Sequence, residues 1–142
     1  MPQKEVREHR GLIEHRQKLV GRRVALQNRL RAILVSQGLP APVGARAWTV
    51  PGLAGIAAHA LPLADCPPRE LWRGRLHLTL TELEHVKGLL EQAEGKLDAL
   101  AKTNAQVRLL ETIPGVGPRT AEAVAAFLPA PALFRTSKQV SA

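Results

Sequence analysis

A run of glycine, proline and polar residues towards the C-terminal end has the residue types and spacing that bind a phosphate. It reads Ile-Pro-Gly-Val-Gly-Pro-Arg-Thr over residues 113–120. Gly115 and Gly117 allow a tight turn with positive φ, and Pro118 suits the first turn of a new helix, where its missing N–H costs nothing. The free backbone N–H groups of such a helix start, together with the positive end of the helix dipole, favour a phosphate oxygen. The chemistry predicted here is noncovalent binding of an anion.

The residues around this turn extend the pattern. An apolar segment leads into Pro-Gly-Val-Gly, and an alanine follows four residues after the second glycine. This arrangement resembles the helix-hairpin-helix motif, which holds nucleic-acid backbone and positions a protein without reading bases. The candidate contacts are Gly115, Val116, Gly117, Arg119, which adds a full positive charge, and Thr120. The alternative is that the run is only a tight turn between two packed helices.

A long basic helix is predicted over residues 4–37. The segment has no proline, and Leu12, Leu19, Leu26 and Ile33 recur every seven residues, which is typical of an amphipathic helix. Its nine basic residues outnumber three acidic ones, and the acidic ones lie in the first half. This excess favours contact with nucleic-acid backbone; a solvated helix face and pairing with an acidic partner helix are the alternatives. The candidate contacts are Arg16, Arg22, Arg23, Arg29 and Arg31.

A second long helix is predicted over residues 68–102. Leu76, Leu83, Leu90 and Leu97 form a heptad repeat, which is the seam of a coiled coil. Acidic residues are more numerous here than in the basic helix, which favours antiparallel pairing of the two. The same seam also suits a homo-oligomer, so the sequence leaves open whether it pairs within one chain or between chains.

The predicted fold class is all-α. A long antiparallel helical hairpin or coiled coil occupies residues 1–102, and a small helix-hairpin-helix unit occupies residues 103–142. A connector rich in proline and glycine spans residues 38–67, and within it a short helix is predicted over residues 51–60, started by Thr49. Leucine, alanine and valine supply most of the 45% hydrophobic content and aromatic residues only 3%, a mix that favours helices over sheets.

The overall charge and the cysteine content limit the function classes. A net charge of +8 and an isoelectric point near 10.8 predict an acidic polymer as partner. A single cysteine, Cys66, excludes an intramolecular disulfide and a thiolate metal cluster, and fits a reducing, cytoplasmic setting. No apolar run approaches the roughly 20 residues that span a bilayer, so no membrane partner is expected. We assign no catalytic residue, metal ligand or cofactor site within this chain.

Four segments in this order together resemble one family. They are EHRQKLVGRRVALQNRLRAIL, the leucine-heptad helix, TIPGVGPRTAEAV and FRTSKQ. The family comprises bacterial insertion-sequence transposases that join a resolvase-like DEDD nuclease domain, through a coiled coil, to a C-terminal domain with a nucleophilic serine, and that use a structured guide RNA. The resemblance implies that this chain is the coiled coil and the start of the C-terminal domain, active in DNA transposition and recombination. It implies DNA and a structured guide RNA as partners, and the leucine seam predicts further copies of the chain as partners through the coiled coil.

The chain also departs from the family pattern. The four acidic residues that bind divalent metal in such transposases, and the nucleophilic serine, belong to regions that this sequence does not include. Ser137 and Ser141 precede the place of that serine, and neither is assigned its role. The sequence therefore predicts a truncated transposase that binds nucleic-acid backbone and dimerises without cleaving DNA by itself. The alternative is a stand-alone, non-enzymatic helix-hairpin-helix DNA-binding protein, and the choice between DNA and RNA as partner is left open.

Overall fold

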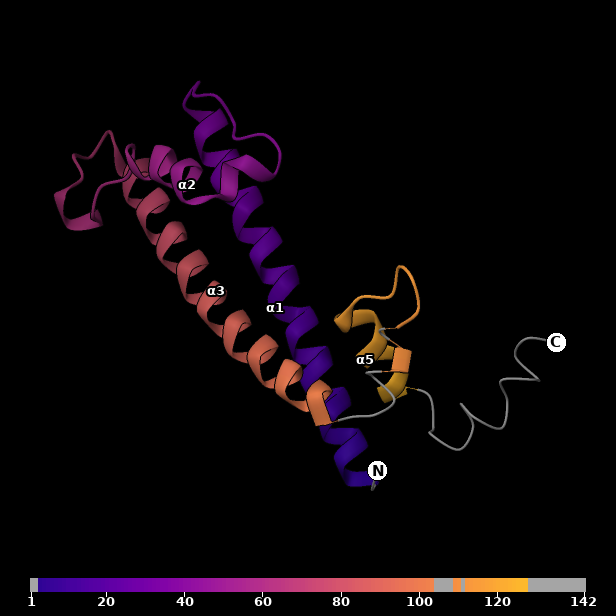
Figure 1. Cartoon of the computed structure of the whole chain (residues 1–142). Helices are drawn as coiled ribbons and strands as arrows, with labels where there is room; N and C mark the ends of the chain where they lie inside the picture. Colours follow the sequence, from indigo (N-terminus) through magenta and orange to yellow (C-terminus); the bar gives the residue numbers. More distant parts are fainter. Residues whose placement is uncertain (1–2, 104–108, 111, 128–142) are drawn as a thin grey trace. The chain divides into compact units, whose positions relative to one another are not determined.

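The computed structural model describes residues 3–103, 109–110 and 112–127 (Figure 1). Every regular element among these residues is a helix, which confirms the predicted all-α fold class. The elements are α1 (Gln3–Ser36), η1 (Ala45–Trp48), α2 (Val50–Ala57), η2 (Leu63–Asp65), α3 (Leu71–Thr103) and α5 (Pro118–Phe127). None of the helices in the described part of the chain is both long and apolar enough to cross a membrane.

The first long helix ends where the sequence predicts. Gly38 has a φ of 72°, which is strained for residues with a side chain. Its N–H donates to the Val35 carbonyl at 3.0 Å, and the N–H of Leu39 donates to the Leu34 carbonyl at 3.0 Å. These two bonds form a Schellman motif, which satisfies carbonyls at the end of a helix. A glycine at this place therefore stops α1 at Ser36.

The connector contains the predicted short helix as α2. The long helix that follows it, α3, begins later than predicted. Thr49 caps α2, because its side-chain oxygen accepts from the N–H of Gly52 at 3.4 Å. The second long helix was expected from residue 68 but begins at Leu71. The N–H of Glu70 donates to the Pro67 carbonyl at 2.9 Å, so the residues just before α3 form a separate turn.

The chain forms two compact units, and both long helices run through each of them. The α5 unit comprises Met1–Lys18 and Leu90–Ala142, and the connector unit comprises Leu19–Leu89. Each unit contains part of α1 and part of α3, which run antiparallel within it. The predicted domain boundary near residue 102 stays a prediction.

In the α5 unit, small side chains bring the last described helix close to the two long ones. Two buried clusters join α5 to its neighbours. They are Ala101, Ala121 and Ala125, with Leu110 and Val116 against them, and Ile13, Leu97 and Ala126, with Leu12 against them. Alanine leaves room for close approach of two helices, so the alanine-rich sequence of α5 explains how a helix of 10 residues is held.

The heptad leucines are buried within the single chain. Leu76 and Leu83 are buried in the connector unit, and Leu90 and Leu97 in the α5 unit. The repeating positions of the basic helix are mostly buried too, and Leu12 packs against the cluster that contains Leu97. Among them, Leu19, Leu26 and Ile33 are buried. Two parts of the predicted C-terminal unit, the segment FRTSKQ and most of the first helix of the hairpin motif, lie outside the described residues.

Candidate nucleic-acid interface

The predicted turn is present and has a defined geometry. The N–H of Val116 donates to the Ile113 carbonyl at 3.1 Å, and Gly115 has a φ of 83°. Proline at the second position, Pro114, and a positive-φ glycine at the third are the features of a type II turn. Gly115 is therefore explained by the backbone conformation alone.

Gly117 has a different conformation from the one predicted. Its φ is not positive, which corrects that expectation. Its carbonyl instead accepts a hydrogen bond from the N–H of Ala121 at 2.9 Å, so Gly117 stands immediately before α5 and starts its hydrogen-bond ladder. Pro118 then occupies the first position of the helix, as predicted.

The outer surface of this turn is open. Gly115 and Gly117 are exposed, and a Cβ added to either would meet no atom within 4 Å in the described part of the chain. Thr120 is exposed as well, and Val116 is half-buried. Neither a turn nor a close internal contact requires glycine at position 117. The backbone there is accessible to a group that approaches from outside the chain.

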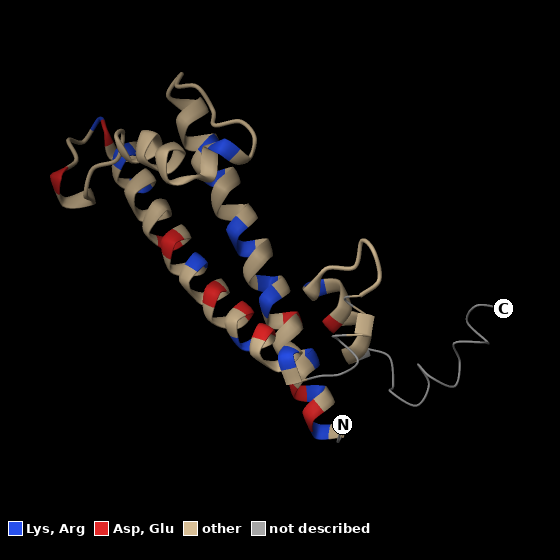
Figure 2. Ribbon diagram, in the orientation of Figure 1, with Lys and Arg blue, Asp and Glu red and all other residues tan. Residues whose placement is uncertain are grey.

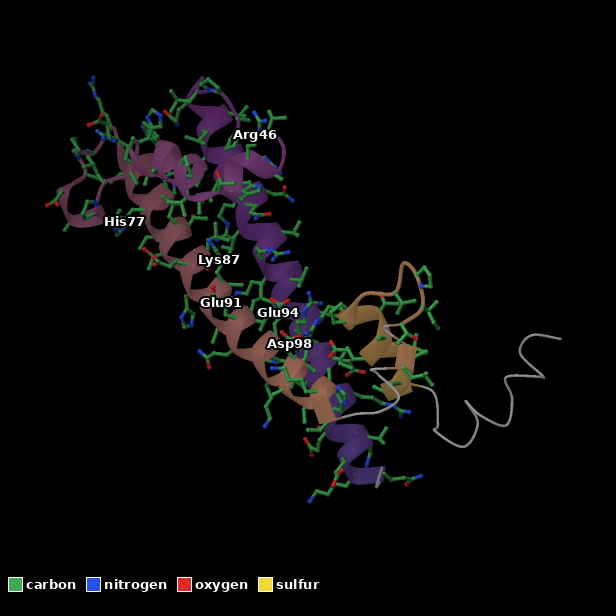
Figure 3. All side chains as sticks on the ribbon, in the orientation of Figure 1. Arg46, His77, Lys87, Glu91, Glu94 and Asp98 are labelled. Atoms are coloured by element: carbon green, nitrogen blue, oxygen red, sulfur yellow. The ribbon has the colours of Figure 1, made fainter. Side chains whose placement is uncertain are left out.

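Arg119 is directed at carboxylates of its own chain. Its Nη1 donates to Oε1 of Glu122 at 2.7 Å, and its Nη2 donates to Oδ1 of Asp98 on α3. Glu122 is only 1% exposed, whereas Asp98 is largely exposed. Asp98 lies one turn beyond Glu94 on α3 (Figure 3). The charge predicted to face a phosphate is thus engaged within the α5 unit.

The same unit buries a histidine near this guanidinium. His9 on α1 is 6% exposed, and its Nε2 has no hydrogen-bond partner among the described residues. Burial, and in second place the positive charge of Arg119, lower the pKa of the imidazole below its ordinary value. The fold therefore favours the neutral form of His9 over the charged form.

Three of the five candidate arginines of α1 pair with acidic residues of α3. Arg16 lies 3.3 Å from Glu94 in the α5 unit. In the connector unit, the carboxylate of Glu82 lies 4.0 Å from Arg22 and 3.9 Å from Arg29. The basic residues of α1 and the acidic residues of α3 can be compared in Figure 2. The alternative of pairing with an acidic helix is therefore realised for these three.

The other two candidate arginines differ from each other. Arg31 lies over the ring of Trp48, 5.0 Å from its centroid, and its Nε donates to the Pro42 carbonyl at 3.1 Å. It thereby fixes the connector on α1. Arg23 is half-buried and forms no ion pair with any described residue. Of the five, Arg23 is the one with neither an ion pair nor a cation–π contact among the described residues.

Three residues of this region were not selected from the sequence. Glu122 follows Arg119 by three residues, a spacing at which helical side chains meet, so its role could have been found. Asp98 lies 21 residues before Arg119, and no local pattern links the two. His9 is separated from Arg119 by even more of the chain than Asp98 is. Only its burial in the folded chain distinguishes it from the other histidines.

The described residues hold no group of three or more histidine, cysteine or acidic side chains that could bind a metal ion. The divalent metal that the family resemblance implies for the full-length protein stays a prediction.

Comparison with known proteins gives two kinds of match. Residues 107–142 match the protein family described as "Transposase IS116/IS110/IS902 family". A "Probable family 20 transposase" of Pseudomonas aeruginosa is 32% identical over 127 residues, which cover 89% of this chain and 36% of that protein. The "Transposase for insertion sequence element IS1111A" of Coxiella burnetii is 32% identical over 132 residues, covering 93% of this chain and 35% of that protein. The chain thus spans about a third of the length of these curated relatives. No solved structure matches it.

Proposed function

Since the chain is related to the bacterial insertion-sequence transposases, as its sequence predicted, we propose that it serves DNA transposition by holding nucleic-acid backbone. The contacts are the open turn at Gly115–Gly117 with the start of α5, and the basic side of α1. Cleavage and strand transfer belong, in this proposal, to parts of a transposase other than the residues described.

One observation carries the proposal, namely the glycine at position 117, which neither a positive φ nor a close contact requires. Gly115 is required by its positive φ, but Gly117 has an ordinary φ and open space where a side chain would stand. A glycine that the fold does not need is well suited to close approach of a phosphate to the backbone. The first N–H groups of α5 lack intrahelical acceptors, and the helix dipole favours an anion there.

The basic helix supports the same proposal through charge. Arg22 and Arg29 share a single carboxylate, Glu82, at the limit of ion-pair distance, and both are exposed. Arg23 adds a charge without an ion-pair partner among the described residues. An exposed surface with more guanidinium than carboxylate groups attracts a polyanion.

The test is binding of the purified chain to labelled duplex DNA and to single-stranded RNA over a range of salt concentrations. For duplex DNA we expect a slope of about −3 to −6 in log K against log salt concentration, since each neutralised phosphate contributes about −0.9. Changing Arg22 and Arg23 to alanine together should reduce the size of this slope by about 2. The double variant Lys87→Ala with Lys96→Ala removes the same charge from α3 and should change the slope less. A flat response to salt would contradict the proposal.

Gly117 provides the more specific variant. Because a Cβ there meets no described atom, Gly117→Ala should fold as the parent does, with a melting temperature lowered only slightly because alanine is less favourable than glycine immediately before a helix. Binding should nevertheless fall about tenfold, and further in Gly117→Val, since the side chain keeps a phosphate from the backbone. Gly95→Ala is the matched control. Gly95 lies on α3, a Cβ added there would also meet no described atom, and the variant should bind as the parent does. If Gly117→Ala bound nucleic acid as tightly as the parent does, the turn would have only a structural role.

Two finer predictions accompany this proposal. The choice between DNA and a structured guide RNA is decided by competition between the two in the same binding assay. Homo-oligomerisation stays a prediction, and the heptad leucines on which it rests are buried within the single chain. The alternative of a stand-alone DNA-binding protein makes the same binding predictions; sequencing the DNA on both sides of the reading frame distinguishes the two.

A further inference from the structure

Arg119 is the central residue of an ion-pair cluster in the α5 unit. It lies in the first turn of α5, two residues after Gly117, and joins a carboxylate of its own helix to one on α3. The opposite end of α5 is held in a similar way, because Nε of Arg10 on α1 donates to the Ala126 carbonyl. Polar contacts thus fix α5 at both ends, and the alanine clusters fix it between them.

The burial of Glu122 determines where the guanidinium can go. A carboxylate that is 1% exposed is stable in its charged form only with a close cation and hydrogen bonds. If Arg119 turned outwards to a phosphate, Glu122 would lose its ion pair and hydrogen bond with Nη1 of Arg119. Asp98 accepts a hydrogen bond from the other terminal nitrogen of the same guanidinium, so Arg119 joins the start of α5 to α3.

From this arrangement we propose that Arg119 is a positioning residue, which ties the start of α5, and with it the turn at Gly115–Gly117, to α3 through Asp98. In this role it acts on bound nucleic acid through the turn and does not contact the phosphates. The inference rests on the proposed function for its effect on binding. The tie between Arg119 and Asp98 can also be measured without any nucleic acid.

Asp98→Asn separates positioning from phosphate contact because the two predict opposite results. If Arg119 bound phosphate, removing a competing negative charge would strengthen binding. If Arg119 positions the turn, the weaker tie lowers the affinity, about threefold to tenfold, at every salt concentration. Glu91→Gln removes a charge from an exposed position on the same helix and is the matched control. Tighter binding by Asp98→Asn than by this control would overturn the inference.

The salt dependence of Arg119 variants gives a second readout. A lost phosphate contact would reduce the size of the log–log slope by about 0.9, whereas a positioning residue leaves the slope unchanged and lowers the affinity uniformly. We expect the unchanged slope for Arg119→Ala. We also expect little rescue by Arg119→Lys, because an ammonium cannot hold two carboxylates with the planar geometry of a guanidinium.

Hydrogen exchange of the free chain tests the tie independently of ligand. The backbone amides of α5 should exchange about tenfold faster in Asp98→Asn and in Arg119→Ala than in the parent, with little further increase in the double variant. Unchanged exchange in Asp98→Asn would overturn the inference even if the chain binds nucleic acid. If the parent binds neither DNA nor RNA, the proposed function fails, and the exchange rates still decide whether Arg119 holds α5 on α3.

Discussion

His9 links a single titratable side chain to the stability of the α5 unit. Its imidazole is buried, lies near the positive charge of Arg119, and has a lowered pKa. In the unfolded chain the same group titrates near its ordinary value of about 6.5. Between the lowered pKa and this value, the unfolded chain binds more protons than the folded one. The free energy of unfolding therefore rises with pH in that window.

We predict that the chain loses stability as the pH falls below about 6.5, and that His9→Gln removes this part of the pH dependence. The measurement is the melting temperature across this range, by circular dichroism. Lys4, Glu5, Glu8 and Lys96 line a groove with His9, and all four are present in both the parent and the variant. His15→Gln, at an exposed position of the same helix, should retain the parent profile. A pH profile of His9→Gln identical to that of the parent would contradict the prediction.

At the residue scale, local chemistry was predictable and distant partners were not. Gly115 and Pro118 have the roles that their residue types impose on a backbone. The ends of α1 and α2 follow in the same way from Gly38 and Thr49. For Arg119 the sequence predicted contact with a phosphate, because a lone basic residue at the start of a helix suggests one. The choice of Asp98 instead depends on how α5 packs, and no short-range pattern contains that information.

The pairing of α1 with α3 sets the availability of positive charge. Glu82 is a single exposed carboxylate within 4.0 Å of two arginines. Exposed pairs of this kind contribute little to stability, typically less than about 1 kcal/mol. Their larger effect is electrostatic, since Glu82 offsets charge that a polyanion would otherwise encounter.

We predict that Glu82→Gln strengthens binding to nucleic acid, about threefold to tenfold at low salt, and makes the salt dependence steeper. The free energy of unfolding should change by no more than about 0.5 kcal/mol. The control is Glu84→Gln, which removes the same charge from an exposed position on α3 that has no ion pair with the described residues. Weaker binding by Glu82→Gln than by this control would mean that α1 and α3 must stay tied for binding.

At the element scale, periodicity predicted both long helices closely, because each is long and regularly amphipathic. It could not tell whether the leucine seam faces its own chain or a second copy, since both arrangements bury the same residues. In the structure, α1 and α3 run antiparallel within each unit, and the seam is buried there. The connector makes this geometry possible, because it lets α3 turn back beside α1.

For the whole molecule, burial of the seam within one chain predicts unfolding that is independent of protein concentration. An intermolecular seam would give a melting temperature that rises with concentration, because association stabilises by mass action. Leu83 is 2% exposed in the connector unit, so Leu83→Ala should lower the free energy of unfolding by about 2 to 5 kcal/mol at any protein concentration. Leu78→Ala, at an exposed leucine of the same helix, should have a much smaller effect. Thermal unfolding over a hundredfold range of protein concentration measures both quantities. A melting temperature that falls on dilution in the parent, and no longer does so in Leu83→Ala, would place the seam between two chains and make the hairpin a dimerisation element.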